Sequence, residues 1–191
     1  MKIVFATNNP NKIAEIKDLL PCEIQILSLK EINCNDELPE TQNTLEGNAV
    51  QKAEFVFTNY GYNCFADDTG LEIEGLNNEP GVYSARYAGV HCSPEENMQK
   101  ALQKLEGKNN RKAKFRTVIA LIMDGKILLF EGECKGEITK EKAGEKGFGY
   151  DPIFRPSGFD KTFAQMSKSE KGVISHRGIA TRKLVEFLQE S

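Results

Sequence analysis

The chain has 191 residues, of which 39% are hydrophobic and 28% are charged, and these values are ordinary for a globular protein of one domain. The formal net charge of -3 excludes a strongly basic nucleic-acid binder, because duplex binding requires an excess of cationic side chains. The 5 cysteines are far apart, include no C-x-x-C pair and accompany only 2 histidines, which excludes the usual close ligand spacing of a zinc site.

No apolar run approaches the roughly 18 residues of a membrane span, so no membrane association is expected. The start of the chain turns polar at residue 7, too early for the apolar core of a signal peptide. Unpaired thiols suit a reducing compartment. The sequence therefore predicts a cytoplasmic protein.

Strands and helices alternate in the first part of the chain. Residues 2–7 form a β-branched and aromatic run typical of a strand, and residues 13–20 place apolar side chains on one helical face. Residues 22–29 alternate like a second strand. Apolar residues at helical spacing over 44–61 predict a helix that Gly61 ends.

The later elements begin with an apolar run at residues 64–66, which leads into an acidic pair. Residues 71–76 then alternate like an exposed strand. Residues 93–107 predict a helix with Ser93 as its N-cap and Pro94 in its first position.

Residues 112–139 predict two strands joined by a type I′ turn at Asp124-Gly125. A long glycine-rich loop at 139–160 and an amphipathic helix at 179–190 complete the chain. With no repeat and no linker, residues 1–191 are expected to form a single α/β domain, a mixed twisted sheet with flanking helices.

The acidic pair, Asp67 and Asp68, places two like charges side by side after an apolar run. Successive side chains of a strand face opposite ways, so the two carboxylates need not share a task. One interpretation is a capped junction between a strand and a turn. The other is a magnesium site, because hard divalent cations bind carboxylate oxygens and bridge phosphates. Glu40 is a candidate second ligand from a separate loop, or a solvated loop charge.

The segment TNNPNK, residues 7–12, lies between a predicted strand and a predicted helix. A helix N-terminus presents unsatisfied N–H groups and a partial positive charge that suit phosphate, and Lys12 adds a full charge. The segment is not a Walker loop, because it contains no glycine. Turn formation alone is the alternative explanation.

Two further segments carry candidate ligands for a nucleotide. In GFGYDP, residues 147–152, either Phe148 or Tyr150 could stack on a base, or the segment is a turn packed on the core. KGVISHRG, residues 171–178, brings together basic side chains that donate to phosphates or base edges, or it is a helix start capped by Ser175. Together, these segments supply acidic side chains for a metal, basic side chains for phosphates and an aromatic side chain for a base. This combination fits a nucleoside triphosphate.

The motifs T-x-N-x-x-K, A-D-D-[ST]-G-L, P-G-x-Y-S-A-R-Y, G-F-G-Y-D-P and S-H-R-G occur in this order along the whole chain. In this the chain resembles the inosine triphosphate pyrophosphatase family, the Ham1-like pyrophosphatases of non-canonical purine nucleotides. The resemblance implies a homodimeric α/β protein with two lobes around a central cleft. It also implies Mg²⁺-dependent hydrolysis of ITP, dITP and XTP to the monophosphate and pyrophosphate.

By the same resemblance, Asp68 corresponds to the metal-binding catalytic base and Glu40 to a metal ligand in a loop. Two departures from the family pattern are Asn8, which we expect to take a turn often given to glycine, and Thr69, which replaces a serine and keeps its hydroxyl. The residues that match substrate contacts of the family are Thr7, Asn8, Asn9, Pro10, Asn11, Lys12, Lys52, Thr69, Phe148, Gly149, Tyr150, Asp151, Lys171, His176 and Arg177.

Two rival functions remain open at this point. One is a related Maf-like pyrophosphatase acting on modified pyrimidines or on dTTP and UTP, against which the FGYDP and SHRG segments argue. The other is a non-enzymatic nucleotide-binding or RNA-binding module, which the net negative charge disfavours. Among purines, we expect Arg177 to favour a 6-keto group, because a guanidinium only donates hydrogen bonds.

Overall fold

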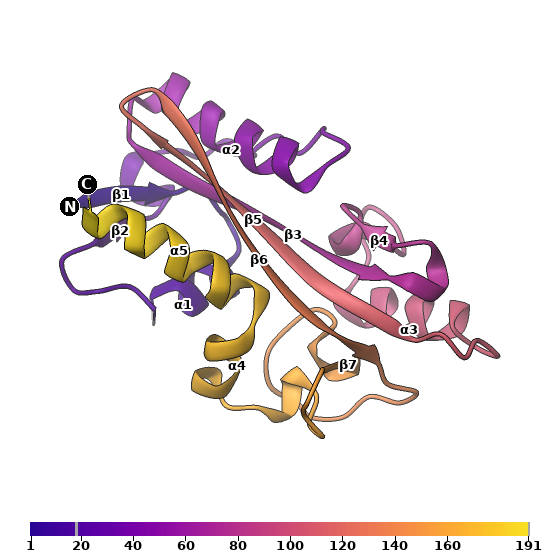
Figure 1. The fold of residues 1–191 in the computed structure, drawn as a ribbon. Coiled ribbons are helices and arrows are strands. Elements are labelled where there is room, and N and C mark those ends of the chain that lie inside the picture. The colour runs from indigo at the N-terminus through magenta and orange to yellow at the C-terminus, as the bar shows by residue number, and fades with distance from the viewer. Residues whose placement is uncertain (18, 191) are drawn as a thin grey trace. The chain divides into compact units, whose positions relative to one another are not determined.

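A computed structural model describes residues 1–17 and 19–190 (Figure 1). The chain divides into two compact units, each built from separate segments of the sequence. Unit 1 comprises Met1–Asp68, Thr117–Gly132 and Arg177–Ser191, and unit 2 comprises Thr69–Arg116 and Glu133–His176. Three strands contribute residues to both units: β3 (Cys64–Ile73), β5 (Lys112–Met123) and β6 (Lys126–Ile138).

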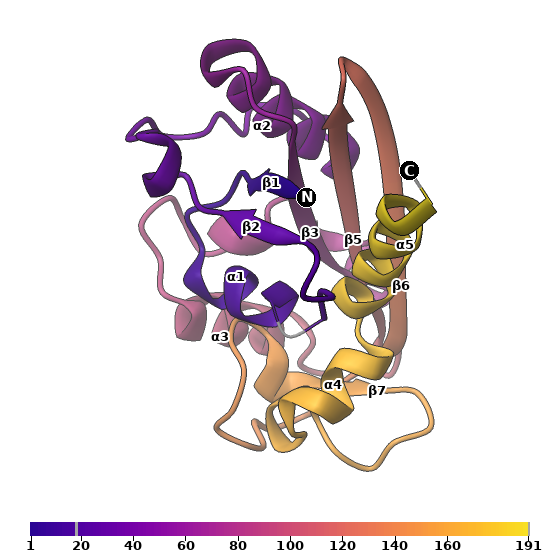
Figure 2. The ribbon, with the colours of Figure 1, turned by 90° about the vertical axis from the view of Figure 1, so that its left-hand side faces the viewer.

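Unit 1 is a sheet with the strand order β2-β1-β3-β5-β6, in which β1 (Lys2–Phe5) runs parallel to both β2 (Gln25–Leu27) and β3. Helices α1 (Pro10–Lys17) and α5 (His176–Glu190) lie on one face of this sheet, and α2 (Leu45–Tyr60) lies on the other (Figures 1 and 2). The core beneath α1 and α5 contains Ile3, Phe5, Ile16, Ile24, Phe65, Ile119, Leu121, Ala180, Leu184 and Leu188.

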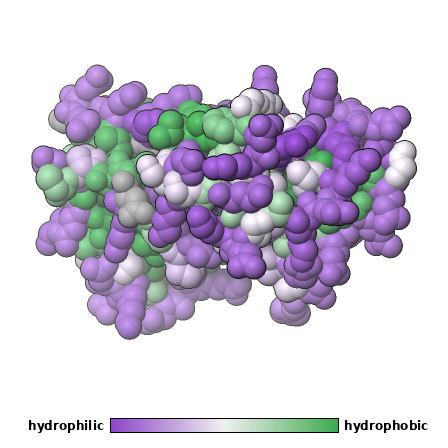
Figure 3. Space-filling view, turned by 90° about the horizontal axis from the view of Figure 1, so that it is seen from below, coloured by the Kyte–Doolittle hydropathy of each residue, from purple (hydrophilic) through white to green (hydrophobic). Residues whose placement is uncertain are grey.

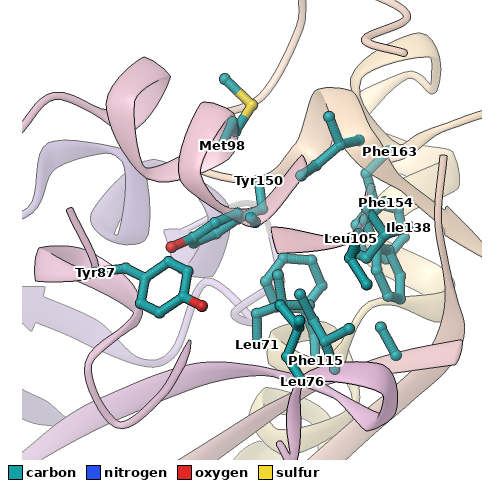
Figure 4. Packing of buried hydrophobic residues seen from close by; sticks show 14 of the residues in the cluster. Leu71, Leu76, Tyr87, Met98, Leu105, Phe115, Ile138, Tyr150, Phe154 and Phe163 are labelled. Atoms are coloured by element: carbon teal, nitrogen blue, oxygen red, sulfur yellow. The ribbon is translucent and has the colours of Figure 1, made fainter. Parts of the chain in front are cut away.

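In unit 2, β4 (Glu79–Gly81) pairs antiparallel with β3, and β7 (Phe154–Pro156) pairs antiparallel with β6. Helices α3 (Pro94–Lys104) and α4 (Lys168–Ile174) also belong to this unit. Its core is rich in aromatic rings, several of which Figure 4 shows. Short 3-10 helices occupy Lys30–Ile32 in unit 1 and Glu74–Leu76, Ser84–Arg86, Asp151–Ile153 and Phe163–Gln165 in unit 2.

Hydrophilic side chains cover most of the face shown in Figure 3. Among the helices of the described residues, none is long and apolar enough to cross a membrane.

Elements whose ends are set by capping or turn residues agree with the sequence prediction. Gly61 ends α2 with a left-handed φ of 72°, and Ser93 caps α3 through a capping box with Glu96. The turn between β5 and β6 has positive φ at both central residues, 51° at Asp124 and 78° at Gly125, which confirms a type I′ hairpin.

Several boundaries differ from the prediction. The helix expected at 13–20 spans Pro10–Lys17, so Leu19 and Leu20 fall in a turn, and Asp18 of that range lies outside the described residues. The strands expected at 2–7 and 22–29 are shorter, and α5 begins at His176 rather than at 179.

The acidic pair does not sit at the junction between a strand and a turn. Asp67 and Asp68 lie inside the ten-residue strand β3, which continues to Ile73. Residues 71–73 of the strand expected at 71–76 are therefore the end of β3, with Leu71 and Ile73 buried rather than exposed, and residues 74–76 form a 3-10 helix. The loop expected at 139–160 contains β7, and α4 forms ahead of α5.

Candidate active site

Asp67 is fully enclosed in unit 1 between two cations. Its Oδ1 lies 2.9 Å from Lys12 Nζ, and its Oδ2 lies 3.3 Å from Arg177 Nε. Burial by itself would raise the pKa of Asp67, but Lys12 and Arg177 outweigh it and hold that pKa well below its usual range. Asp67 is therefore an ionised anchor for two basic side chains.

Asp68, the next residue, has different partners. Its Oδ2 accepts a hydrogen bond from Asn48 Nδ2 at 3.0 Å, and its Oδ1 lies 3.9 Å from Lys52 Nζ. Burial raises the pKa of Asp68 despite the opposing charge of Lys52. The two neighbouring carboxylates thus have opposite pKa shifts, as the alternation of a strand allows. A carboxylate with a raised pKa suits proton acceptance better than one locked in ion pairs.

Lys52, on α2, joins Asp68 to Glu40. Its Nζ donates to Glu40 Oε1 at 2.5 Å and to the backbone oxygen of Asp67 at 2.8 Å. Burial alone would lower the pKa of Lys52, but Asp68 and Glu40 outweigh it, so the pKa is raised and the side chain is protonated. A cationic group therefore already lies between the two carboxylates that the sequence assigns to a metal.

The donor set formed by Glu40 and Asp68 fits Mg²⁺, which prefers carboxylate oxygens and completes its coordination with water and substrate phosphates. The ammonium group of Lys52 shows that this place accommodates positive charge. No group of three or more His, Cys, Asp and Glu side chains that could hold a metal occurs within residues 1–17 and 19–190. Phosphate and water ligands would therefore be needed as well.

The segment 7–12 forms a capped helix start. Thr7 Oγ1 accepts from the N–H of Asn9 at 3.2 Å, and Asn9 Oδ1 accepts from the N–H groups of Asn11 and Lys12 at 3.0 and 3.4 Å. Pro10 takes the first helical position. The Asn9 side chain thus already satisfies helix N–H groups that were expected to bind phosphate.

Lys12 is the charged residue of this segment. Besides its ion pair with the Asp67 side chain, its Nζ contacts the backbone oxygen of Asp67 at 3.3 Å. Burial lowers the pKa of Lys12, with Asp67 opposing that effect. The expectation for Asn8 was wrong: among the described residues outside glycine, positive φ occurs only at Asn33, Asn77, Asn78 and Asp124.

Arg177 belongs to unit 1, whereas Lys171 and His176 belong to unit 2. The side chain of Arg177 is 2% exposed, and its guanidinium forms ion pairs with Asp67 and with Glu15 of α1. Burial opposes its charge, but Asp67 and Glu15 outweigh that effect and raise the pKa of Arg177. The sequence did not predict that Glu15 pairs with Arg177, because an acidic residue on a helix surface has no local pattern that indicates such a partner.

In unit 2, the structure distinguishes the two aromatic candidates of the loop at 147–151. Tyr150 is buried beside Tyr87 in the core (Figure 4), and its hydroxyl donates to the backbone oxygen of Ser84 at 2.8 Å. Burial raises the pKa of that hydroxyl. Phe148 is only partly buried, so it is the better candidate for stacking on a base.

Asp151 closes this loop. Its Oδ2 accepts from the N–H of Phe148 at 2.9 Å and from Lys171 Nζ at 2.6 Å. Lys171 Nζ also lies 5.1 Å from the centre of the Phe148 ring. Gly147 has a φ of 76°, and a Cβ there would overlap the Asp151 carboxylate, so only glycine allows this closure.

Gly149, also a candidate, is partly buried in the loop with a φ of 62°. The other two candidates of unit 2 lie outside the loop. His176 is buried, and its ring stacks on Phe115 with centroids 4.5 Å apart. Thr69 is partly buried within β3. The structure thus brings together Lys12, Glu40, Lys52, Asp67, Asp68 and Arg177 in unit 1, and Phe148, Asp151 and Lys171 in unit 2.

Comparisons with known proteins cover almost the entire chain. Residues 3–187 match the model of the Ham1 family. The chain is 56% identical over 188 residues to a dITP/XTP pyrophosphatase of Flavobacterium johnsoniae, covering 98% of each chain. Among solved structures, it is similar to a HAM1 protein from Coxiella burnetii, with a TM-score of 0.92 and 40% identity over 100% of both chains. The Ham1 protein of Staphylococcus aureus gives a TM-score of 0.90 at 43% identity, over 100% of this chain and 99% of that one.

Proposed function

Because this chain belongs to the Ham1 family, we propose that it is a nucleoside triphosphate pyrophosphatase that hydrolyses dITP, ITP and XTP. Water adds to the α-phosphorus, the bond from that phosphorus to the α–β bridging oxygen breaks, and the products are the monophosphate and pyrophosphate. The observation that carries this proposal is the 56% identity, over 98% of both chains, to a protein named dITP/XTP pyrophosphatase. Such an enzyme would remove deaminated purines from the nucleotide pool.

In this proposal, unit 1 binds the triphosphate. Lys12, Lys52 and Arg177 supply positive charge next to the acidic pair, and charge of this kind stabilises a transferring phosphoryl group. Arg177 pairs with Asp67 and Glu15, so we assign it to this cluster and not, as expected from the sequence, to the 6-keto group of the base. Glu40 and Asp68 would hold Mg²⁺, which neutralises phosphate charge and orients the reacting oxygens when bound. By the same family resemblance, Asp68 is also the proposed acceptor of the proton from the attacking water.

Unit 2, we propose, recognises the base. Phe148 would stack on the purine, while Asp151 and Lys171 keep the loop in shape. The N–H groups of Phe148 and Asp151 are used inside the loop, so those of Gly149 and Tyr150 remain as candidate donors to a 6-keto group. A donor opposite the 6-amino group of adenine leaves two donors unpaired, at a cost of about 1–3 kcal/mol each. ATP would therefore be a poor substrate.

The family resemblance further supports a homodimer, and the unpaired cysteines together with substrates from the nucleotide pool support a cytoplasmic location. We propose no nucleic-acid partner, because the net charge is -3.

The test is release of pyrophosphate from ITP, dITP, XTP, ATP, GTP, UTP and dTTP, each with and without Mg²⁺. We expect kcat/KM for ITP, dITP and XTP to exceed that for ATP by at least about 10²-fold, with turnover dependent on Mg²⁺. Preferred hydrolysis of UTP or dTTP would favour the Maf-like alternative. Nucleotide binding without any product would favour a non-enzymatic module.

A further inference from the structure

The segment Glu40–Gln42, the acid loop, lies against α2, and each of its residues contacts a different side chain of that helix. Lys52 donates to the carboxylate of Glu40. The N–H of Thr41 donates to Gln51 Oε1 at 2.9 Å, and Gln51 Nε2 donates back to Thr41 Oγ1 at 2.8 Å. One carboxamide thus holds both the backbone and the side chain of the residue next to Glu40.

Asn48 connects the acid loop to Asp68. Its Oδ1 accepts from the N–H of Gln42 at 2.9 Å, and its Nδ2 donates to Asp68 Oδ2 at 3.0 Å. The side chain is 1% exposed. A carboxamide both accepts and donates, which a carboxylate or an ammonium cannot do. Asn48 therefore ties the backbone beside Glu40 to the carboxylate of Asp68 through one buried group.

Gly47 lets the loop approach the helix closely. A Cβ at this position would lie 2.7 Å from Gln42 Cβ and 3.0 Å from Thr44 Oγ1, closer than van der Waals contact permits. The acid loop therefore packs directly on the backbone of the first turn of α2, where a larger residue would displace it.

We propose that Asn48 and Gln51 are positioning residues of the metal site, which hold Glu40 at a fixed place relative to Asp68. The inference rests on the proposed function, because the cation these two carboxylates bind is the Mg²⁺ of that function. Glu40 is on an exposed loop, and ordering such a loop costs conformational entropy at each binding event. If hydrogen bonds already order the loop before the cation binds, this entropy is not lost on binding, because the ligands are already in position.

The first experiment measures amide hydrogen exchange in Asn48→Ala and Gln51→Ala. We expect exchange to rise about tenfold at Gln42 in the first variant and at Thr41 in the second, because each loses its one described acceptor. Asn59→Ala is the matched control, since Asn59 lies on the same helix and bonds only the backbone oxygen of Phe55 among its described contacts. Unchanged exchange at both loop amides would overturn the proposal.

The second experiment measures Mn²⁺ affinity by electron paramagnetic resonance, with α,β-imido-ITP bound so that no turnover occurs. We expect the affinity to fall about 10–100-fold in Asn48→Ala and Gln51→Ala, as for other groups that orient metal ligands, and to stay within about twofold in Asn59→Ala. Gly47→Ala should weaken Mn²⁺ binding in the same range without removing a hydrogen-bonding group. Alanine also favours helix formation over glycine, so α2 should persist in that variant.

Faster loop exchange with unchanged Mn²⁺ affinity would show that these side chains hold the loop without positioning a ligand, and would overturn the inference. Failure of the proposed function gives a different result, in which the wild-type protein itself neither hydrolyses ITP nor binds Mn²⁺ with the analogue. A lower Mn²⁺ affinity in the variants, together with pyrophosphate release by the wild type, would support both the positioning role and the proposed function.

Discussion

The charged cluster of unit 1 and the loop cluster of unit 2 bury ionised groups in different surroundings. In unit 1, Asp67 and Asp68 share Lys12, Lys52 and Arg177 in a network of several charges. In unit 2, the ion pair between Asp151 and Lys171 lies beside the aromatic rings of Phe148 and Phe163. A network of many charges can exchange a partner for a phosphate or a cation, whereas the pair of Asp151 and Lys171 fixes the shape of the loop at 147–151.

The comparison extends to the acidic pair itself. Asp67 has the partners of a structural ion pair, with its pKa lowered, and Asp68 has the raised pKa of a group whose charge is poorly compensated. Stability and reactivity are therefore separated between two adjacent residues. Substitutions at Asp68, Asp67 and Phe148 each alter one side of these comparisons, and a substitution at Gly125 serves as their control.

The largest expected effect is that of Asp68→Asn. The amide keeps the shape but can neither accept a proton nor bind Mg²⁺ strongly, so kcat/KM for ITP should fall about 10²–10⁴-fold. Because burial disfavours the charge of Asp68, the thermal midpoint should stay at or above that of the wild type. Calorimetry alongside pyrophosphate release checks both. Near-normal turnover would remove Asp68 from the mechanism.

Asp67→Asn should act mainly on stability. Removing the charge of Asp67 takes away the ion-pair partner of Lys12 and one acidic partner of Arg177, and should lower the free energy of unfolding by about 3–5 kcal/mol. The loss of turnover should be smaller than in Asp68→Asn. Urea titration at pH 7 measures the first effect. A loss of turnover equal to that of Asp68→Asn would show that the two carboxylates share one role.

The same pair predicts a pH dependence. The folded-state pKa of Asp67 is lowered, so its contribution to stability is fully present above the unfolded value of about 3.9 and is lost as the pH falls towards the folded value. The stability difference between wild type and Asp67→Asn should therefore narrow below about pH 4. Urea titrations between pH 6 and pH 3 measure it. A constant difference would mean that the ion pairs do not stabilise the fold.

Phe148→Ala should affect the base rather than the phosphates. Loss of one stacking surface costs about 1–3 kcal/mol, so KM for ITP should rise roughly 5–150-fold. Tyr150→Phe is the contrasting variant, because it removes only the buried hydroxyl bonded to Ser84. It should lower stability by about 1 kcal/mol with little change in KM. Equal effects of the two variants on KM would contradict the assignment of stacking to Phe148.

The smallest effect is expected at the hairpin turn. Gly125→Ala places a side chain at a φ of 78° with no atom within 4 Å, so strain in the backbone is the main cost, about 1 kcal/mol. ITP turnover should be unchanged, which makes the variant a control for stability loss alone. A change in KM would show that the two clusters respond to general destabilisation.

Local residues account for the parts of the fold that the sequence predicts well. Ser93 with Pro94 starts α3, Gly61 ends α2, and Asp124-Gly125 sets the hairpin turn, each through chemistry within a few residues. The strand β7 has only three residues and depends on pairing with Gly136–Ile138, which no local pattern reveals. Propensity alone could not place it.

The candidate site shows the same division. The acidic motif identified Asp68, and the family resemblance added Lys52 and supported Glu40, but only the packing of α2 shows how the three side chains are linked. One feature of the sequence could have indicated the role of Asn48. Asparagine is a weak helix former, and here it lies inside a predicted helix among apolar neighbours. The sequence could not decide whether Phe148 or Tyr150 stacks on the base, because both are aromatic. The structure distinguishes them, since Tyr150 is buried and Phe148 is only partly buried.

The assembly of unit 1 from separate segments has a consequence for how the protein is made. Arg177 follows its partner Asp67 by 110 residues, and α5 supplies Ala180, Leu184 and Leu188 to the core. At a synthesis rate of about 5–20 residues per second, the nascent chain carries Asp67 without Arg177 for roughly 5–20 s. The core of unit 1 is completed only when α5 has left the ribosome, so a chain truncated before residue 177 would expose apolar surface and be recognised by chaperones or proteases.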